Sequence, residues 1–307
     1  MALGFVFPGQ GSQSLGMLSE LAEKYPIVQQ TFAVASDVLG YDLWQLVQQG
    51  PEDKLNETQH TQPALLTSSV AIWRVWNEEQ GAQPSIMAGH SLGEYSALVC
   101  AGSIKLEDAI TLVAKRGEYM QEAVPAGTGA MAAILGLSDE QVKSACNDAA
   151  QGEVVSAVNF NSPGQVVIAG SVNAVERAMQ LCKEAGAKRA LKLAVSVPSH
   201  CQLMEPAAQR LLDRLSKIQI AAPAIPVINN VDVSVETDAD KIRDALKRQL
   251  CNPVRWVETI EAMAGNGVSR LIECGPGKVL VGLNKRIVKD MEALPIFSPD
   301  TIDQALQ

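Results

Sequence analysis

The segment that most constrains the fold is Gly89-His90-Ser91-Leu92-Gly93, which joins a short apolar run to a stretch with helical character. Residues 85–89 have the length and apolarity of a buried strand, and residues 94–100 continue as a helix. Small residues at both ends of the segment allow a strand to turn sharply into a helix with the serine at the apex. The pattern therefore favours an α/β fold in which Ser91 is an exposed nucleophile. The alternative is an ordinary strand–helix turn.

Strands and helices alternate along most of the chain. Apolar runs at residues 4–7, 226–229 and 269–273 predict further strands, and helical patterns fill most of the chain up to about residue 79. A loop at residues 275–277 is expected to lead into a final helix. Alternation of this kind predicts an α/β fold with a mostly parallel sheet and helices on both faces.

The middle of the chain follows a different order. The expected elements are a strand at 131–137, a helix from a capping box at 138–141 to about 150, a hairpin of strands 154–160 and 165–169 around the turn 161–164, a helix at 173–185 and a strand at 190–195. This β-α-β-β-α-β order is that of a ferredoxin-like unit. We therefore expect a large domain of residues 1–126 and 197–307, with a small domain of residues 127–196 inserted in it. A cleft between two domains is a common ligand site.

The composition restricts the partners and the compartment. Of 307 residues, 47% are apolar and 19% are charged, which is typical of a globular chain. The net charge of −9 argues against nonspecific binding of nucleic acid, which needs a basic surface. Six scattered cysteines without a C-x-x-C pair argue against a zinc site or a disulfide framework and indicate reduced thiols in the cytoplasm. The N-terminus has no signal-peptide pattern, and no apolar run approaches the roughly 20 residues of a membrane span.

A serine hydroxyl needs a base at neutral pH, and the chain has three histidines. His90 is expected to point away from the tight turn, and a surface or structural role is expected for His60. His200 lies where the chain returns from the small domain to the large one, at the expected cleft. Elimination therefore selects His200 as the base, against the alternative of a hydrogen-bonded structural histidine.

A carboxylate that would complete a triad is not evident between Ser91 and His200. Asp108 lies in the first turn of an expected helix, and Asp139 belongs to the capping box, so neither occupies a strand-end loop. We therefore expect a dyad in which a backbone carbonyl or an amide side chain orients His200.

Arg116 lies on an apolar helix face that also carries Val113 and Met120. A guanidinium in such surroundings needs an anion, and its planar fork suits a carboxylate. The anion can be a substrate carboxylate or an internal acid, and the pattern leaves both open.

The backbone N–H of Leu92 is expected to face the reacting carbonyl, and the loop after the first strand could bring a second N–H, that of Gln10.

Taken together, these motifs resemble the malonyl-CoA:acyl carrier protein transacylase family of bacterial fatty-acid synthesis. The matching segments run in family order over nearly the whole chain: residues 7–13 (FPGQGSQ), 61–64 (TQPA), 88–95 (AGHSLGEY), 116–117 (RG), 159–165 (NFNSPGQ), 197–200 (VPSH), 252–254 (NPV) and 275–277 (GPG). The resemblance implies a hydrolase-like large domain with a ferredoxin-like insert. It also implies an acyltransferase that uses malonyl-CoA and acyl carrier protein as substrates, with no bound cofactor and no metal.

The same resemblance implies a role for each candidate residue. The implied site consists of Ser91 as nucleophile, His200 as base, Gln10 and Leu92 as backbone oxyanion donors, Arg116 as ligand of the malonyl carboxylate, Gln249 as the group that orients His200, and Met120, Asn161 and Val279 as pocket residues. The implied reaction is ping-pong: malonyl-CoA acylates the serine, coenzyme A leaves, and the phosphopantetheine thiol of the carrier then attacks the ester.

Carrier proteins of this kind are strongly acidic, so docking one on a chain of net charge −9 needs a local basic patch. Two adjacent pairs of cations stand out, Lys188-Arg189 and Lys285-Arg286, and both pairs are candidate docking residues. The alternative for each pair is a solvated basic face.

Two other functions are open at the level of the sequence. The same serine could serve an ester or thioester hydrolase, although the missing acid and the presence of Arg116 argue against it. The chain could also be a catalytically silent docking module, against which the intact set of Ser91, His200 and Arg116 argues. Among transferases, a methylmalonyl or plain acyl substrate is an alternative, and the resemblance of residues 197–200 to the stand-alone malonyl enzymes favours malonyl.

Overall fold

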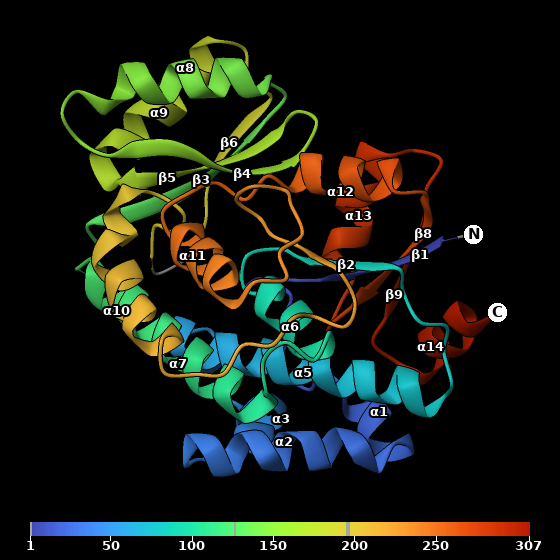
Figure 1. Ribbon diagram of the computed structural model, residues 1–307. Coiled ribbons are helices and arrows are strands. Elements are labelled where there is room, and N and C mark those ends of the chain that lie inside the picture. The colour runs from blue at the N-terminus through green and yellow to red at the C-terminus, as the bar shows by residue number, and fades with distance from the viewer. Residues whose placement is uncertain (1, 126, 195–196) are drawn as a thin grey trace.

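The computed structural model describes residues 2–125, 127–194 and 197–307 and contains two β-sheets (Figure 1). The larger sheet has the order β7-β2-β1-β8-β9, and each pair of neighbouring strands in it is parallel. Its strands are β1 (Ala2–Phe7), β2 (Ile86–Gly89), β7 (Val227–Ile228), β8 (Val268–Cys274) and β9 (Glu292–Ile296). The predicted α/β fold around a mostly parallel sheet is confirmed.

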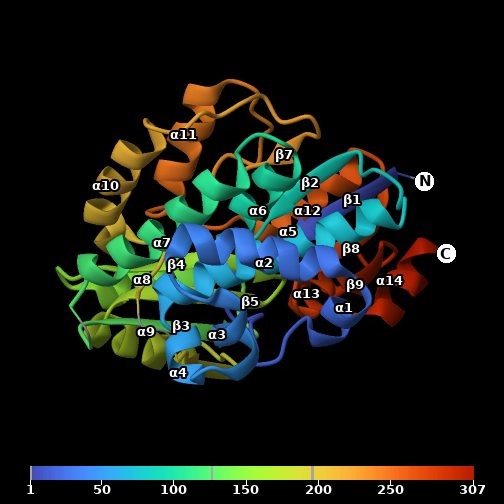
Figure 2. The ribbon, with the colours of Figure 1, turned by 90° about the horizontal axis from the view of Figure 1, so that it is seen from below.

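Helices cover both faces of this sheet. Before β2 they are α1 (Ser19–Lys24), α2 (Pro26–Leu39), α3 (Leu43–Gln49), α4 (Glu52–Leu55) and α5 (Thr58–Glu78), and after it come α6 (Gly93–Cys100) and α7 (Leu106–Ala123). The C-terminal part adds the 3₁₀ turn η1 (Gln202–Met204) and helices α10 (Glu205–Leu215), α11 (Ala239–Gln249), α12 (Trp256–Gly265), α13 (Val279–Ile287) and α14 (Pro299–Leu306). Figure 1 shows α12 and α13 on one side of the sheet and α2 and α5 on the other, and Figure 2 shows α2 lying across α5 on the outer surface.

Alternate residues of the central strand β1 pack on opposite faces of the sheet. Phe5 and Phe7 belong to the core that α2, α5, α6 and α7 cover, whereas Val6 belongs to the core under α12 and α13. All three side chains are fully buried. Burial on both faces is what a central parallel strand requires, and it explains why β1 is an unbroken apolar run.

The carboxyl ends of the central strands lie side by side. The register pairs Phe7 with Gly89 across β1 and β2, and Ala88 with Ile228 across β2 and β7. Strand β8 runs parallel on the other side of β1. The loops that follow these strands therefore gather at one edge of the sheet, which is where open α/β sheets place their ligand sites.

The C-terminal end differs from the sequence prediction. The helix after residues 275–277 is present as α13, but the expectation that it is the final helix is wrong, because β9 and α14 follow it. β9 is one of the two edge strands of the sheet, contains Pro295, and begins with an exposed residue. A proline within an apolar run argues against a strand unless the strand lies at an edge, so the sequence pattern missed β9.

The small sheet is antiparallel and has the order β4-β5-β3-β6. It consists of β3 (Gly129–Leu135), β4 (Val155–Ser162), β5 (Gln165–Ser171) and β6 (Arg189–Lys192), with helices α8 (Asp139–Ala150) and α9 (Val172–Glu184) packed on it. The predicted ferredoxin-like order is confirmed. The predicted capping box is also present, because the Ser138 hydroxyl accepts from the N–H of Gln141 and the Gln141 side chain accepts from the N–H of Ser138.

Several boundaries of the small sheet differ from the prediction: β3 is Gly129–Leu135 where 131–137 was expected, and β5 extends to Ser171 where 169 was expected. The hairpin turn consists of residues 163–164 and not 161–164, because Ser162 pairs with Gln165 and Gly164 takes the positive φ that a two-residue turn needs. The last strand ends at Lys192, and Val195, which the prediction included, lies outside the described residues.

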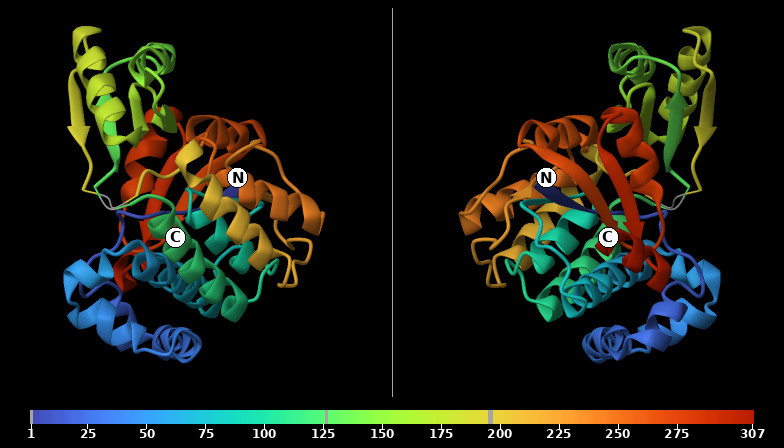
Figure 3. Two further views of the ribbon diagram at one scale, coloured as in Figure 1. Left: turned by 90° about the vertical axis from the view of Figure 1, so that its left-hand side faces the viewer. Right: turned by 90° about the vertical axis from the view of Figure 1, so that its right-hand side faces the viewer.

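A backbone bridge joins β4 to the segment after α11. The N–H of Val254 donates to the carbonyl of Val158 at 2.8 Å, and the N–H of Phe160 donates to the carbonyl of Val254 at 3.0 Å. Figure 3 shows the small sheet and its helices as a lobe at one end of the molecule. We propose residues 1–126 with 197–307 and residues 127–196 as the two domains, and the separate apolar cores of the two sheets support this division.

Candidate active site

The turn between β2 and α6 places Ser91 at the carboxyl edge of the large sheet. Ser91 has a φ of 54°, in the left-handed region that residues other than glycine seldom adopt. A Cβ on Gly89 would lie 1.9 Å from the carbonyl carbon of Gly93, and a Cβ on Gly93 would lie 2.0 Å from the carbonyl oxygen of Phe7. Both positions therefore require glycine, and the predicted sharp turn with a serine at its apex is confirmed.

His200 lies directly against the hydroxyl of Ser91. Ser91 Oγ is 2.7 Å from His200 Nε2, and His200 Nδ1 is 2.7 Å from the backbone carbonyl oxygen of Gln249. A carbonyl oxygen only accepts, so Nδ1 carries the proton and Nε2 can accept the proton of the hydroxyl. The backbone of Gln249 thus occupies the place that an acid takes in a triad, which explains why the sequence lacks a suitable carboxylate.

Burial keeps His200 neutral. The residue is 3% exposed, and burial, followed by repulsion from the charge of Arg116, lowers its pKa to about 3. An imidazole with so low a pKa is unprotonated throughout the neutral range, so it can accept a proton without first losing one.

Arg116 on α7 brings a positive charge to the same place, in a residue only 1% exposed. Its guanidinium donates to Gln62 Oε1 at 2.9 Å and to Gln249 Oε1 at 3.0 Å, and it lies 3.4 Å from Ser91 Oγ. In the described ranges, the hydrogen bonds of this guanidinium go to neutral oxygens, no carboxylate lies within ion-pairing distance, and Nε has no partner. The internal salt bridge that the sequence left open is therefore not formed, and the charge remains available to an anionic ligand.

Three buried polar residues at the site were not identified as site residues from the sequence: Glu94, Asn230, and Gln62, which bonds to Arg116. Glu94 in the first turn of α6 accepts hydrogen bonds from Gln249 Nε2 at 2.8 Å and from the N–H of Asn230 at 2.9 Å, and burial raises its pKa to about 7. Asn230 in turn contacts the backbone of Ser91. A carboxylate three residues after the serine, on a helix with no other charged residue, could have indicated Glu94. The Asn229-Asn230 pair after a short strand gives no comparable signal.

The two expected oxyanion donors lie at the same edge of the sheet. Leu92 immediately precedes α6, and Gln10 lies in the loop after β1. Because Phe7 pairs with Gly89, this loop starts beside the turn that carries Ser91. Backbone N–H groups in such positions can stabilise a tetrahedral oxyanion, and the role of both residues stays a prediction.

The three expected pocket residues have different surroundings. Met120 is buried on α7, where its sulfur lies 3.5 Å from Gln62 Nε2. Asn161 on β4 has its Oδ1 at 2.8 Å from His90 Nε2. Val279, the first residue of α13, is 49% exposed. Their roles in an acyl pocket stay predictions.

The other two histidines have partners of their own. His90 points from the turn toward Asn161, and its ring centroid lies 5.4 Å from that of Trp256. His60 at the start of α5 has Nδ1 at 3.0 Å from the hydroxyl of Tyr41. The expectation that neither serves Ser91 agrees with these contacts.

The four candidate docking residues lie on the surface in two separate places. Lys188 and Arg189 are at the start of β6 in the small sheet, and Lys285 and Arg286 are in the last turn of α13. All four are exposed. A docking role for either pair stays a prediction.

The part of the chain that the structure describes contains no group of three or more His, Cys, Asp or Glu side chains that could hold a metal ion. None of the helices in these ranges is both long and apolar enough to cross a bilayer. The six cysteines are free of disulfide bonds.

On this α/β scaffold, a serine hydroxyl bonded to a neutral imidazole is the arrangement of serine-dependent acyl transfer. Comparison with known proteins leads to the same class, because residues 4–304 match the family model of the acyl transferase domain.

Individual relatives narrow this class to one family. The chain is 63% identical over 302 residues to the malonyl CoA-acyl carrier protein transacylase of Salmonella typhimurium, with 98% of each chain covered. It is 45% identical over 306 residues to the transacylase of the same name from Bacillus subtilis, with 99% and 96% covered. The chain belongs to the malonyl CoA-acyl carrier protein transacylase family.

Solved structures agree with this assignment. An acyl carrier protein S-malonyltransferase from Vibrio cholerae has a TM-score of 0.97 at 64% identity, with 99% of each chain covered. A malonyl-transacylase solved in complex with a type II PKS acyl-carrier protein has a TM-score of 0.99 at 62% identity, with 100% of this chain and 99% of that chain covered.

The low pKa of His200 can be tested without substrate. Because burial and Arg116 disfavour the imidazolium, we expect the ring resonances of His200 to stay unchanged between pH 8 and pH 5 in an NMR titration. The ring of a free histidine peptide, which titrates near pH 6.5, is the control. A midpoint near that of the peptide would contradict a buried neutral base.

Proposed function

We propose that this chain moves a malonyl group from malonyl-CoA to the phosphopantetheine thiol of acyl carrier protein through a malonyl ester on Ser91. The observation that carries the proposal is the contact of Ser91 Oγ with His200 Nε2 at 2.7 Å, beside the buried guanidinium of Arg116. The names of the relatives support malonyl-CoA as donor and acyl carrier protein as acceptor.

The first half-reaction acylates the serine. Ser91 Oγ attacks the thioester carbonyl while His200 Nε2 takes the hydroxyl proton, and the carbonyl oxygen becomes an oxyanion between the N–H groups of Gln10 and Leu92. When the tetrahedral intermediate collapses, the C–S bond breaks and the imidazolium returns the proton to the sulfur of coenzyme A. The carbonyl of Gln249 stabilises the transient imidazolium through Nδ1–H.

The second half-reaction repeats these steps with a different thiol. His200 takes the proton of the carrier thiol, the sulfur attacks the malonyl ester, and the C–O bond to Ser91 breaks. The proton then returns from the imidazolium to Ser91 Oγ, which restores the enzyme. The reaction is ping-pong because one serine serves both halves.

The charge of Arg116 supports an acyl group that ends in a carboxylate. A buried cation without an acidic partner is unfavourable, and a bidentate carboxylate would compensate for it. The hydrogen bonds to Gln62 and Gln249 hold the guanidinium beside Ser91 before any ligand arrives. Malonyl offers such a carboxylate, whereas acetyl does not.

Two alternatives lead to different products. A hydrolase with the same serine would release free malonate continuously, and a silent docking module would not be acylated at all.

Six cysteines without disulfide bonds support a cytoplasmic location for the proposed reaction.

The acyl-enzyme is the first thing to measure. Incubation with malonyl-CoA and no carrier should give a stable malonyl adduct in the intact mass that maps to Ser91. Ser91→Ala should carry no adduct, because the attacking oxygen is gone. Steady release of malonate without an adduct would instead identify a hydrolase, and neither adduct nor turnover would favour the silent module.

The carboxylate role of Arg116 predicts a loss that depends on the acyl group. Arg116→Ala should slow malonyl transfer by on the order of 10²-fold, corresponding to a lost charged hydrogen-bonded pair, and should slow acetyl transfer much less. Acetyl-CoA is the matched substrate, since it lacks only the carboxylate. Equal losses with both donors would refute the role.

Docking of the carrier predicts an effect on the second half-reaction alone. Lys285→Glu with Arg286→Glu should raise the KM for the acidic carrier and reduce its salt dependence, while acylation by malonyl-CoA stays unchanged. The corresponding reversal of Lys188 and Arg189 shows whether the small domain contributes. Unchanged carrier kinetics in both double variants would mean that neither pair docks the carrier.

A further inference from the structure

The turn that carries Ser91 is held by a side chain from another strand-end loop. Asn230, two residues after β7, is completely buried. Its Oδ1 accepts from the N–H of Ser91 at 2.7 Å, and its Nδ2 donates to the carbonyl of Gly89 at 2.6 Å. The orientation of the amide is determined, because the N–H only donates and the carbonyl only accepts.

These two hydrogen bonds take the place of the backbone ladder between β2 and β7, which ends just before the turn. β7 pairs with β2 up to Ile228 opposite Ala88, and no further residue of β7 continues the ladder. Beyond that point the side chain of Asn230 takes both backbone groups that flank His90. A turn with Ser91 at a φ of 54° is strained, and such a conformation persists only where its surroundings hold it.

Asn230 is itself anchored on the helix that follows the serine. Its backbone N–H donates to Glu94 Oε2 at 2.9 Å, and the same oxygen accepts from Gln249 Nε2 at 2.8 Å. Gln249 Nε2 also lies 3.1 Å from the carbonyl oxygen of Ser91. The backbone on both sides of the Ser91 Cα is therefore held by the amide side chains of two residues, and both residues also donate to the same carboxylate oxygen of Glu94.

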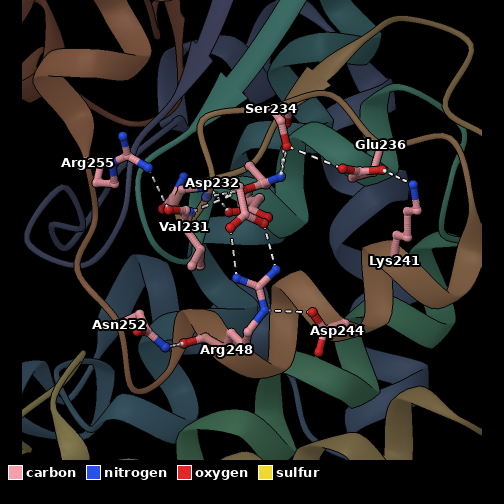
Figure 4. Close-up of polar contacts among 12 residues, drawn as sticks. Val231, Asp232, Ser234, Glu236, Lys241, Asp244, Arg248, Asn252 and Arg255 are labelled. Atoms are coloured by element: carbon pink, nitrogen blue, oxygen red, sulfur yellow. Dashed lines mark hydrogen bonds and ion pairs between the residues drawn. The ribbon is translucent and has the colours of Figure 1, made fainter.

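An ion pair outside the site braces the loop of Asn230. Figure 4 shows Arg248 on α11 facing Asp232 with both terminal nitrogens, at 2.9 and 2.6 Å, while its Nε bonds to Asp244 at 2.6 Å. In the same view Arg255 donates to the carbonyl of Val231 at 3.1 Å. The loop is thus tied to α11 one residue before Gln249, whose carbonyl orients His200.

We infer that Asn230 is a positioning residue for Ser91, and that the pair Arg248–Asp232 keeps its loop in register with the segment that orients His200. Asn230 contacts the backbone of the turn and not the reacting atoms, so it acts through the placement of Ser91 Oγ against His200 Nε2. The inference rests on the proposed role of Ser91 as nucleophile.

The test measures the reactivity of Ser91 in two ways in the full-length chain. One is the single-turnover rate of acylation by malonyl-CoA, with the KM for this donor. The other is the rate at which a small fluorophosphonate labels Ser91, a reaction in which the serine oxygen bonds to phosphorus and fluoride leaves. The second probe needs no malonyl group.

Asn230→Ala should lower both rates by about 10²-fold, the effect typical of a misplaced reacting group, with little change in the KM for malonyl-CoA. Ser103→Ala is the matched control. Ser103 is also buried, in the loop between α6 and α7, and its replacement removes one hydrogen bond, which the hydroxyl donates to the carbonyl of Ala221 at 2.7 Å. It should lower the melting temperature and leave both rates unchanged.

Asn230→Asp keeps the shape and the acceptor for the N–H of Ser91 but loses the donor for Gly89. It should give rates between those of the wild type and Asn230→Ala, and it serves as the main variant if the alanine does not fold. Folded Asn230→Ala or Asn230→Asp with wild-type rates would overturn the inference.

If the ion pair Arg248–Asp232 acts through Asn230, substitutions at Arg248 and Asn230 should have non-additive effects on the acylation rate. Arg248→Met should reduce the acylation rate in the wild type and reduce it much less in Asn230→Ala, because the brace acts through that side chain. Equal reductions in both backgrounds would refute the link to the ion pair.

The two probes also separate the inference from the proposed function. If the wild type reacts with the fluorophosphonate at Ser91 but not with malonyl-CoA, the proposed donor is wrong, and the labelling rates of the variants still test the inference. A wild type whose Ser91 reacts with neither would overturn both.

Discussion

The hydrogen bond between Ser91 and His200 joins residues that are 109 positions apart, and much of the large domain serves to bring them together. Both residues have positive φ angles, 54° for Ser91 and 65° for His200. Each such conformation costs roughly 1 kcal/mol or more and persists only when its surroundings determine it. For Ser91 the parallel sheet supplies these surroundings, because its strands deliver their loops to one edge.

Gln249 is the residue on which the polar contacts of the site converge. Its backbone carbonyl orients His200, and its side chain contacts Arg116 and Glu94 as well as the backbone of Ser91. These contacts connect a buried cation and a buried carboxyl group through one neutral amide, without a direct ion pair. A guanidinium held in this way stays unneutralised, which a site for an anionic group requires.

The sequence is sufficient for the parts of the fold that follow a local pattern. The apolar run of β1, the glycine-flanked turn at Ser91 and the capping box at Ser138 are local, and the structure contains each of them. Elimination among three histidines leads to His200, which the structure places against Ser91, because few residue types can act as the base.

Other parts depend on contacts between distant segments and leave little local trace. The apolar run of β9 is interrupted by Pro295, which a strand tolerates only where one of its sides has no neighbouring strand. In the sequence Asn230 looks like any loop residue, and its role is visible only in the structure, where β7 ends beside the turn of Ser91. The orienting group of His200 is a backbone carbonyl, which every residue possesses, so no residue type in the sequence could indicate it.

The closeness of Arg116 to His200 makes the proton and the acyl carboxylate thermodynamically linked ligands. The guanidinium lowers the proton affinity of the imidazole, so on the proposed mechanism a carboxylate that neutralises the guanidinium raises this affinity. Linkage is reciprocal, and the imidazolium formed during the reaction therefore strengthens the hold on the carboxylate by the same free energy. The bound acyl group would thus adjust the strength of the base that activates the thiol, and the empty site would be the state in which His200 holds a proton least.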